Sequence, residues 1–288
     1  MAYPGGKAQA GVYQAIIHQI PTHTFYGEPF LGKGAVLRYK RPATRSIGID
    51  ANPDVVQHWQ EHSMPGVIVR CGDALEFLNS FRFGRDAFLY LDPPYLMEVR
   101  STQQAYYQHE FFEDEQHLKL LRLIKTLRCN IAISGYWSQM YAQMLSDWRV
   151  ISFNAVTRSG RVATEHLWMN YPEPVELHDY RYLGSNFRER ERIKRKTQRW
   201  LQKLKAMPLL ERRALMAAIN QLSADIATSD DDGDGRGPVL SFPSPDLAMM
   251  ANIDENDDSA GGIATNGDAG ALERSQPEID QFLKECEL

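Results

Sequence analysis

The stretch Phe88-Leu89-Tyr90-Leu91-Asp92-Pro93-Pro94-Tyr95-Leu96 contains an apolar run that ends on a carboxylate and is followed at once by two prolines and an aromatic residue. The run is apolar on both faces, which is typical of a buried strand in a parallel sheet. Because prolines cannot donate backbone hydrogen bonds, the strand has to stop at Pro93. We therefore predict that Asp92 lies at the carboxyl end of a core strand, where open α/β sheets bind their ligands. The alternative is an Asp-Pro turn that only terminates the strand.

The composition of the 288-residue chain limits the possible classes of protein. Its length suits one substantial core or two small domains, and it contains no apolar run long enough to span a membrane. The first residues lack the basic and apolar regions of a secretion signal. Three widely spaced cysteines, Cys71, Cys129 and Cys286, show no metal-ligand spacing. We therefore expect a cytoplasmic protein that binds neither membrane nor metal, and we expect it to be a monomer.

The net charge of −5 conceals a strong asymmetry along the chain. Residues 225–288 carry 16 acidic and three basic residues, whereas residues 1–224 carry 29 basic and 21 acidic residues. The net charge is therefore −13 in the C-terminal part and +8 in the rest. A basic body indicates a polyanionic partner.

Acidic residues also follow three earlier predicted strands. The first strand leads from Thr24 to Glu28 and into a Gly-x-Gly turn at residues 32–34, with a helix opening near Lys33. Such a turn suits a bound carboxylate or phosphate, but Leu37 occupies the third glycine position of the dinucleotide-binding pattern. The second strand ends at Asp50, and the third leads to Asp73. Each acid alone could be a helix cap, but four in succession favour a ligand site.

These motifs together resemble the DNA adenine methylase family. The resemblance rests on Tyr-Pro-Gly-Gly-Lys (3–7), Glu-Pro-Phe-Leu-Gly-Lys-Gly (28–34), Gly-Ile-Asp (48–50), Gly-Asp-Ala (72–74), Asp-Pro-Pro-Tyr (92–95) and the later stretch 164–171. It covers about residues 1–172 and implies S-adenosyl-L-methionine as the cofactor. It also implies a doubly wound, mostly parallel seven-stranded α/β sheet of the Rossmann-like, class I methyltransferase type.

The resemblance assigns cofactor contacts residue by residue. Asp50 would hold the ribose hydroxyls, Asp73 would bind the adenine amino group of the cofactor, and the glycine turn would surround its methionine part. The full set of implied cofactor-binding residues is Tyr3, Gly6, Lys7, Phe30, Gly32, Gly34, Asp50, Asn52, Asp73, Ala74 and Asp92.

The implied catalytic residues are Asp92, Pro93, Pro94 and Tyr95, which would receive a flipped-out adenine. An exocyclic amine is a poor nucleophile because its lone pair is delocalised into the ring. If Asp92 and the Pro93 carbonyl accept its two N–H bonds, the lone pair localises and can attack the methyl group directly. Tyr95 would stack on the base after flipping.

Cytosine has a comparable amino group, so a cytosine methyltransferase and a silent DNA-binding protein of the same fold stay open. Leu37 disfavours a nicotinamide enzyme.

The sites that would read double-stranded DNA are less well defined. Only 60 residues separate Gly32 from Asp92, which leaves no room for the recognition domain that many family members insert there. Three segments are candidates, each with a structural alternative: the loop 97–112, the turn 156–164 and the basic stretch 188–205, which has nine basic and two acidic residues. The candidate DNA-binding residues in them are Arg100, Tyr106, Tyr107, Arg158, Arg161, Arg195 and Lys196. The alternatives are a loop over the cofactor, a plain hairpin turn and a solvated helix.

We thus predict three segments: a methyltransferase domain at 1–172, a basic helical extension at 173–227, and an acidic tail at 228–288. The tail is rich in Asp, Gly, Ser and Asn and cannot bury enough apolar surface to offset ordering, so we expect it to be disordered.

Overall fold

The computed structural model describes residues 7–9, 11–95, 114–156 and 161–229. The predicted acidic tail lies outside these residues, apart from its first two. The described chain divides into two compact units, one reaching to Gln198 and the other beginning at Arg199.

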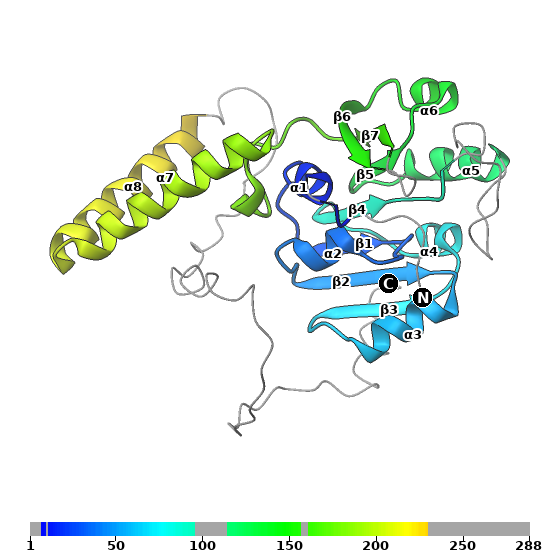
Figure 1. Ribbon diagram of the computed structural model, residues 1–288, viewed down its shortest axis with the longest axis horizontal. Helices are drawn as coiled ribbons and strands as arrows, with labels where there is room; N and C mark the ends of the chain where they lie inside the picture. The colour runs from blue at the N-terminus through cyan, green and yellow to red at the C-terminus, as the bar shows by residue number, and fades with distance from the viewer. Residues whose placement is uncertain (1–6, 10, 96–113, 157–160, 230–288) are drawn as a thin grey trace. The chain divides into compact units, whose positions relative to one another are not determined.

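A seven-stranded sheet forms the centre of the first unit (Figure 1). Its strands are β1 (Phe25–Glu28), β2 (Arg45–Asp50), β3 (Val67–Cys71), β4 (Ala87–Leu91), β5 (Asn130–Gly135), β6 (Arg149–Val156) and β7 (Val162–Met169). They lie in the order β3-β2-β1-β4-β5-β7-β6. The first five pair in parallel, whereas β7 is antiparallel to both β5 and β6. The predicted doubly wound, mostly parallel sheet is thus confirmed.

The helices of the first unit cover both faces of this sheet. They are α1 (Val12–Ile17), α2 (Ala35–Tyr39), α3 (Pro53–Glu61), α4 (Ala74–Ser80), α5 (Asp114–Ile124) and α6 (Gln139–Met144), with a short 3-10 helix at Tyr180–Tyr182. Strand β4 shows why two layers are needed. Phe88 and Tyr90 pack into a cluster with residues of α1, α2 and α3, whereas Leu89 and Leu91 pack with residues of α4, α5 and α6. Because successive side chains of a strand point to opposite faces, a wholly apolar strand requires helices on both sides.

The strand order defines where a ligand binds. The chain moves outward from β1 through β2 to β3 and then crosses back to place β4 on the other side of β1. The connections therefore reverse direction between β1 and β4. This is the topological switch point, where open α/β sheets leave a crevice at the carboxyl ends of the strands.

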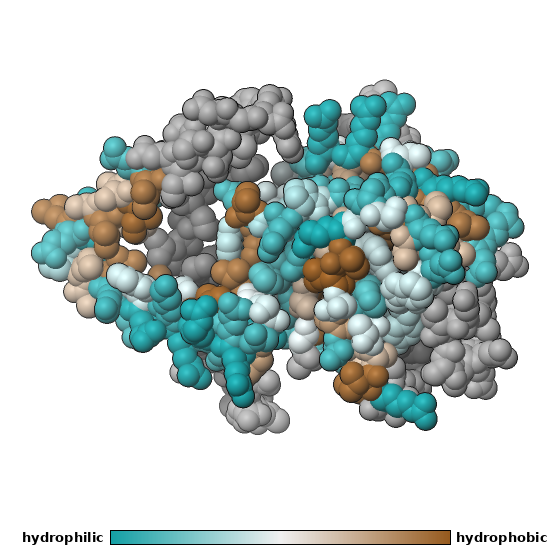
Figure 2. Space-filling model, turned by 90° about the horizontal axis from the view of Figure 1, so that it is seen from above, coloured by the Kyte–Doolittle hydropathy of each residue, from teal (hydrophilic) through white to brown (hydrophobic). Residues whose placement is uncertain are grey.

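Two longer helices follow the sheet, α7 (Phe187–Ala206) and α8 (Leu209–Ser229). Helix α7 contains the basic stretch, and none of its residues is fully buried. Arg195 and Lys196 on it are exposed. The face seen in Figure 2 is mostly hydrophilic, with apolar side chains in separate groups. Among the described residues, no helix is long and apolar enough to cross a membrane.

Candidate active site

Three carboxylates mark the carboxyl edge of the sheet near the switch point. Glu28 is the last residue of β1, Asp50 is the last residue of β2, and Asp92 directly follows β4. Since β2, β1 and β4 are parallel neighbours, these residues lie along one edge. Asp73 follows β3 and caps α4, because its Oδ1 accepts a hydrogen bond from the backbone N–H of Glu76 at 2.9 Å. In this structure Asp73 therefore acts as a helix cap, which is one of the two roles considered from the sequence, and its side chain is exposed.

The glycine turn is fixed from two sides. Asp50 Oδ2 accepts a hydrogen bond from Gly32 N–H at 2.7 Å, and its Oδ1 accepts from Asn52 N–H at 2.9 Å. On the other side, Trp59 Nε1 donates to the Gly32 carbonyl at 2.9 Å. Helix α2 begins at Ala35, two residues later than predicted, and has five residues. Its dipole is correspondingly small, and the held backbone of the turn is the main feature of this part of the site.

Gly34 permits the close approach of Trp59 to this turn. Its φ is +56°, and a Cβ atom there would lie 2.4 Å from Trp59 Cζ2. We expect Gly34→Ala to destabilise the protein by several kcal/mol, because the left-handed backbone strain adds to a clash with a buried ring. Gly66→Ala is the matched control. Its φ is +74° but nothing lies within 4 Å of the position that a Cβ would take, so only the backbone cost of about 1–2 kcal/mol remains. Urea unfolding of both variants measures the difference, and equal losses would contradict this role of Trp59.

Glu28 is a buried carboxyl group beside the switch point. The Tyr26 hydroxyl donates to Glu28 Oε2 at 2.7 Å. Burial raises the pKa of Glu28 to about 8, and the nearby charge of Asp92 adds to the rise, against the opposing effect of the Tyr26 hydrogen bond. Glu28 is therefore mostly protonated at neutral pH, and it does not add a second full negative charge next to Asp92.

This protonation gives an expected pH dependence. Between pH 5 and 8 the folded protein keeps a proton on Glu28 that the unfolded chain loses, so Glu28 makes the wild type less stable as the pH rises, by up to about 1.4 kcal/mol per pH unit. We expect Glu28→Gln to remove this contribution, so that the variant gains stability relative to the wild type across that range. Unfolding free energies at pH 5, 6.5 and 8 measure it. A difference between the two proteins that does not change with pH would refute the assignment.

Asp92 is held through one of its two carboxylate oxygens. Its Oδ1 accepts a hydrogen bond from Ser134 Oγ at 2.8 Å and lies 2.9 Å from the Lys7 ammonium. Ser134 lies on β5 and is fully buried, and its hydroxyl also lies 3.0 Å from the Tyr90 hydroxyl. Among the described residues, none donates to Asp92 Oδ2. The side chain of Asp92 is 27% exposed, so a ligand can reach the carboxylate.

Lys7 connects Asp92 to a second buried carboxylate. Its ammonium also lies 3.0 Å from Glu165 Oε2 on β7, and the side chains of Lys7 and Glu165 are both 9% exposed. The Lys7 ammonium donates to the Tyr95 hydroxyl as well. Burial lowers the pKa of Lys7, but the negative charges of Asp92 and Glu165 outweigh this effect and raise the pKa well above its usual value. Lys7 is therefore a permanent cation between two carboxylates.

The aromatic part of the site comes from two loops. The Tyr95 and Tyr136 rings lie with their centroids 4.4 Å apart at an angle of 57°. Burial raises the pKa of the Tyr95 phenol, and the charge of Asp92 adds to this, so the ring stays neutral. Two neutral rings beside a carboxylate can accept a planar base by stacking.

Nine of the predicted site residues lie at or beside this edge, namely Lys7, Gly32, Gly34, Asp50, Asn52, Asp92, Pro93, Pro94 and Tyr95. Phe30 instead packs against the core cluster that contains Leu89, and Ala74 is buried in α4. Tyr3, Gly6, Arg100, Tyr106, Tyr107 and Arg158 lie outside the described residues. Arg161 is exposed next to β7.

Sequence reasoning missed three residues of the site, namely Ser134, Tyr136 and Glu165. Ser134 lies near the carboxyl end of β5, so the rule used for the acidic residues could have found it. Glu165 lies within the stretch 164–171 that contributed to the resemblance, but nothing in the sequence indicates that it meets Lys7.

The strand order, with its switch point between β1 and β4 and its antiparallel β7, defines the class I, Rossmann-like methyltransferase fold, as predicted. A family model described as D12 class N6 adenine-specific DNA methyltransferase matches residues 61–158. The match spans about a third of the chain and supports both the predicted resemblance to the DNA adenine methylase family and methyltransferase activity.

Solved structures with this fold are distant from the chain. A precorrin 8W decarboxylase from Methanobacterium thermoautotrophicum is 16% identical, with a TM-score of 0.39 over 59% of this chain and 94% of that one. A dimethyladenosine transferase from Plasmodium falciparum is 13% identical, with a TM-score of 0.35 over 55% of this chain and 60% of that one. Likenesses at this level carry no argument about substrate. A search of curated proteins gave no match.

The residues at this edge fit the cofactor that the family implies. S-Adenosylmethionine has ribose hydroxyls and two positive charges, on its sulfonium and its ammonium group. Asp50 supplies a carboxylate at the end of β2, and its hydrogen bond to Gly32 fixes the glycine turn beside it. Glu28, which is mostly neutral, can accept or donate a hydrogen bond there.

Proposed function

We propose that this protein transfers a methyl group from S-adenosyl-L-methionine to the exocyclic amino group of adenine in double-stranded DNA. The observation that carries the proposal is the state of Asp92: Lys7 and Ser134 hold Oδ1, and Oδ2 is left for an incoming N–H group. The family model supports adenine and DNA as the substrate.

The side chains around Asp92 would prepare the amine for reaction. Asp92 Oδ2 accepts one N–H of the amine and the Pro93 carbonyl accepts the other, so the lone pair leaves conjugation with the ring. The ion pair with Lys7 fixes the position of the carboxylate, so little reorganisation is needed when positive charge develops on the nitrogen. Tyr95 and Tyr136 stack on the base. S-Adenosylmethionine supplies an electrophilic methyl group on a sulfonium centre.

DNA contacts outside the pocket would come from basic residues. Arg161 next to β7 and Arg195 and Lys196 on α7 are exposed. Lysine and arginine that meet phosphates give an affinity that falls steeply with salt. We also propose that residues 97–112 and 157–160, which border Tyr95 and β7 in the sequence, contribute to reading the target site.

Transfer of labelled methyl groups to mixed-sequence duplex DNA, followed by nucleoside analysis, tests the proposal. Label in N6-methyl-2′-deoxyadenosine is the expected result. Label in methylated cytosine would favour the alternative amine acceptor, since Asp92 and Pro93 would serve either base. Binding to DNA without transfer of label would instead identify a silent DNA-binding protein of this fold.

A further inference from the structure

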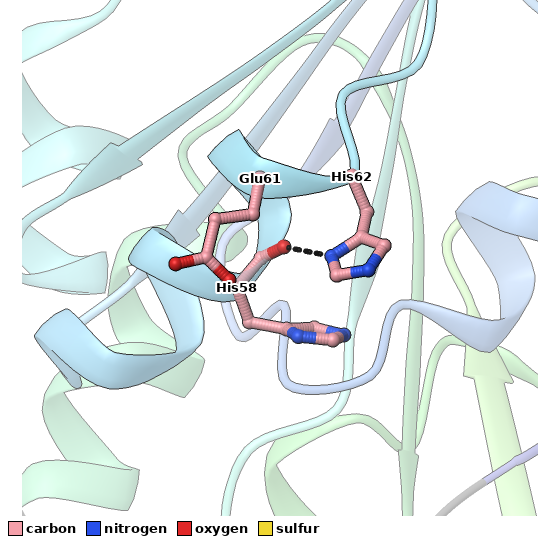
Figure 3. A group of neighbouring side chains, drawn as sticks. All are labelled: His58, Glu61 and His62. Atoms are coloured by element: carbon pink, nitrogen blue, oxygen red, sulfur yellow. Dashed lines mark hydrogen bonds between the residues drawn. The ribbon is translucent and has the colours of Figure 1, made fainter.

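Three metal-ligating side chains gather on the last turn of α3 (Figure 3). His58, Glu61 and His62 stand at positions i, i+3 and i+4, which places them on one face of a helix. One ligand atom from each lies within 4.8 Å of the others, and all three residues are exposed. Two nitrogen ligands of one zinc ion lie about 3.4 Å apart, so modest rotation of these exposed side chains suffices to share an ion.

The hydrogen bonds of the cluster orient two of the three ligands. His62 Nδ1 lies 2.9 Å from the His58 carbonyl oxygen. Because a carbonyl can only accept, Nδ1 carries the proton, and the lone pair of His62 is on Nε2. Histidines that bind metals are commonly oriented in this way, with one ring N–H given to a carbonyl. Gln57 Nε2 likewise donates to Glu61 Oε1 at 3.0 Å and holds that carboxylate.

The position of the cluster on the helix also favours a cation. Glu61 is the last residue of α3 and His62 is its cap. The unpaired carbonyls at a helix C-terminus give that end a partial negative charge. Two imidazoles and one carboxylate select zinc, nickel, copper or cobalt, whereas magnesium and calcium prefer an all-oxygen shell.

We propose that His58, Glu61 and His62 form a binding site for a divalent transition-metal ion, with water completing its coordination. The site is separate from the proposed methyl-transfer site, because α3 starts after Asp50 at the carboxyl edge and runs back toward the start of the parallel strand β3. The ion stabilises the fold through the last turn of α3. That turn also contains Trp59, which is 1% exposed and donates to the carbonyl of Gly32.

The test measures metal binding and thermal stability of the full-length chain with zinc chloride, nickel chloride and magnesium chloride. We expect saturating nickel or zinc to raise Tm by about 5 °C, and magnesium to have no effect. The double variant His58→Ala/His62→Ala should lose at least about tenfold in nickel affinity and lose the rise in Tm. Gln60→Ala, an exposed change on the same helix, is the matched control and should behave as the wild type.

The outcomes separate this site from other metal-binding groups. Cys71 is exposed and is an alternative zinc ligand, so Cys71→Ser should keep the nickel effect. An equal Tm rise in the wild type and the double histidine variant would overturn the proposal, as would the absence of nickel and zinc binding by the wild type at millimolar concentration. Methyl-transfer activity is not needed as a readout, so failure of the proposed function leaves this result unaffected.

Discussion

Replacement of Asp92 by alanine is expected to lower the rate of methyl transfer by on the order of 10³-fold, while the affinity for S-adenosylmethionine changes little. The variant removes the only side-chain acceptor proposed for the reacting amine. Loss of one group that stabilises developing charge costs enzymes about 10²–10³-fold, and Asp92 in addition orients the base. The fold should persist, because Lys7 keeps its second carboxylate partner, Glu165, at 3.0 Å.

Single-turnover transfer and calorimetric binding of the cofactor separate the two effects. Asp54→Ala removes an exposed carboxylate of the same type on α3 and should transfer methyl groups as the wild type does. Asp92→Asn keeps one acceptor oxygen but loses the charge, so its rate should fall between those of the wild type and Asp92→Ala. Undiminished turnover in Asp92→Ala would refute the proposed role of the carboxylate.

The carboxyl edge of the sheet was predictable because its signals are local in the sequence. Each of the strands β1, β2 and β4 ends on or next to an acid. Because the carboxyl ends of parallel strands lie at the same edge of a sheet, Glu28, Asp50 and Asp92 could be placed together from the sequence. The strand order itself does not follow from these runs. The family resemblance implied a doubly wound, seven-stranded sheet without giving its strand order, and the sheet topology confirms that sheet.

The contacts that hold Asp92 were not predictable in the same way. Lys7, Ser134 and Glu165 come from three separate parts of the chain and meet only once the antiparallel strand β7 lies beside β5. Lys7 was assigned to the cofactor by resemblance, whereas the structure places its ammonium on Asp92.

The His-x-x-Glu-His pattern at residues 58–62 is visible in the sequence. The expectation of no metal rested on the spacing of the cysteines, and that spacing says nothing about histidine ligands.

The contacts of Lys7 with Asp92 and Glu165 give the second large expected effect. Replacement of Lys7 by methionine should destabilise the protein by about 3–5 kcal/mol near neutral pH, because it leaves two carboxylates without their shared cation in a largely buried site. The two oxygens that contact Lys7, one from Asp92 and one from Glu165, are at most about 6 Å apart. At this distance two negative charges repel each other once the cation is removed. Methyl transfer should fall as well, since Asp92 loses the group that fixes its Oδ1.

The pH dependence of this loss distinguishes charge from packing. In the wild type the contribution of Lys7 is complete below the usual lysine pKa and declines only as the pH rises from there through the raised pKa, so it is constant between pH 5 and 8. In Lys7→Met the repulsion between the two carboxylates raises their pKa values, and the variant therefore loses stability as the pH rises from 5 to 8. Chemical unfolding at both pH values measures this trend.

The double variant Lys7→Met/Glu165→Gln removes the repulsion together with the cation. It should recover part of the stability at pH 8 and little at pH 5, where a carboxyl with a raised pKa is already partly protonated. If Lys7 contributed through packing alone, the loss in Lys7→Met would be the same at both pH values and the second substitution would restore nothing. The recovery at pH 8 would therefore assign the stabilising role of Lys7 to its charge, which in the folded protein is shared between the proposed catalytic carboxylate and Glu165.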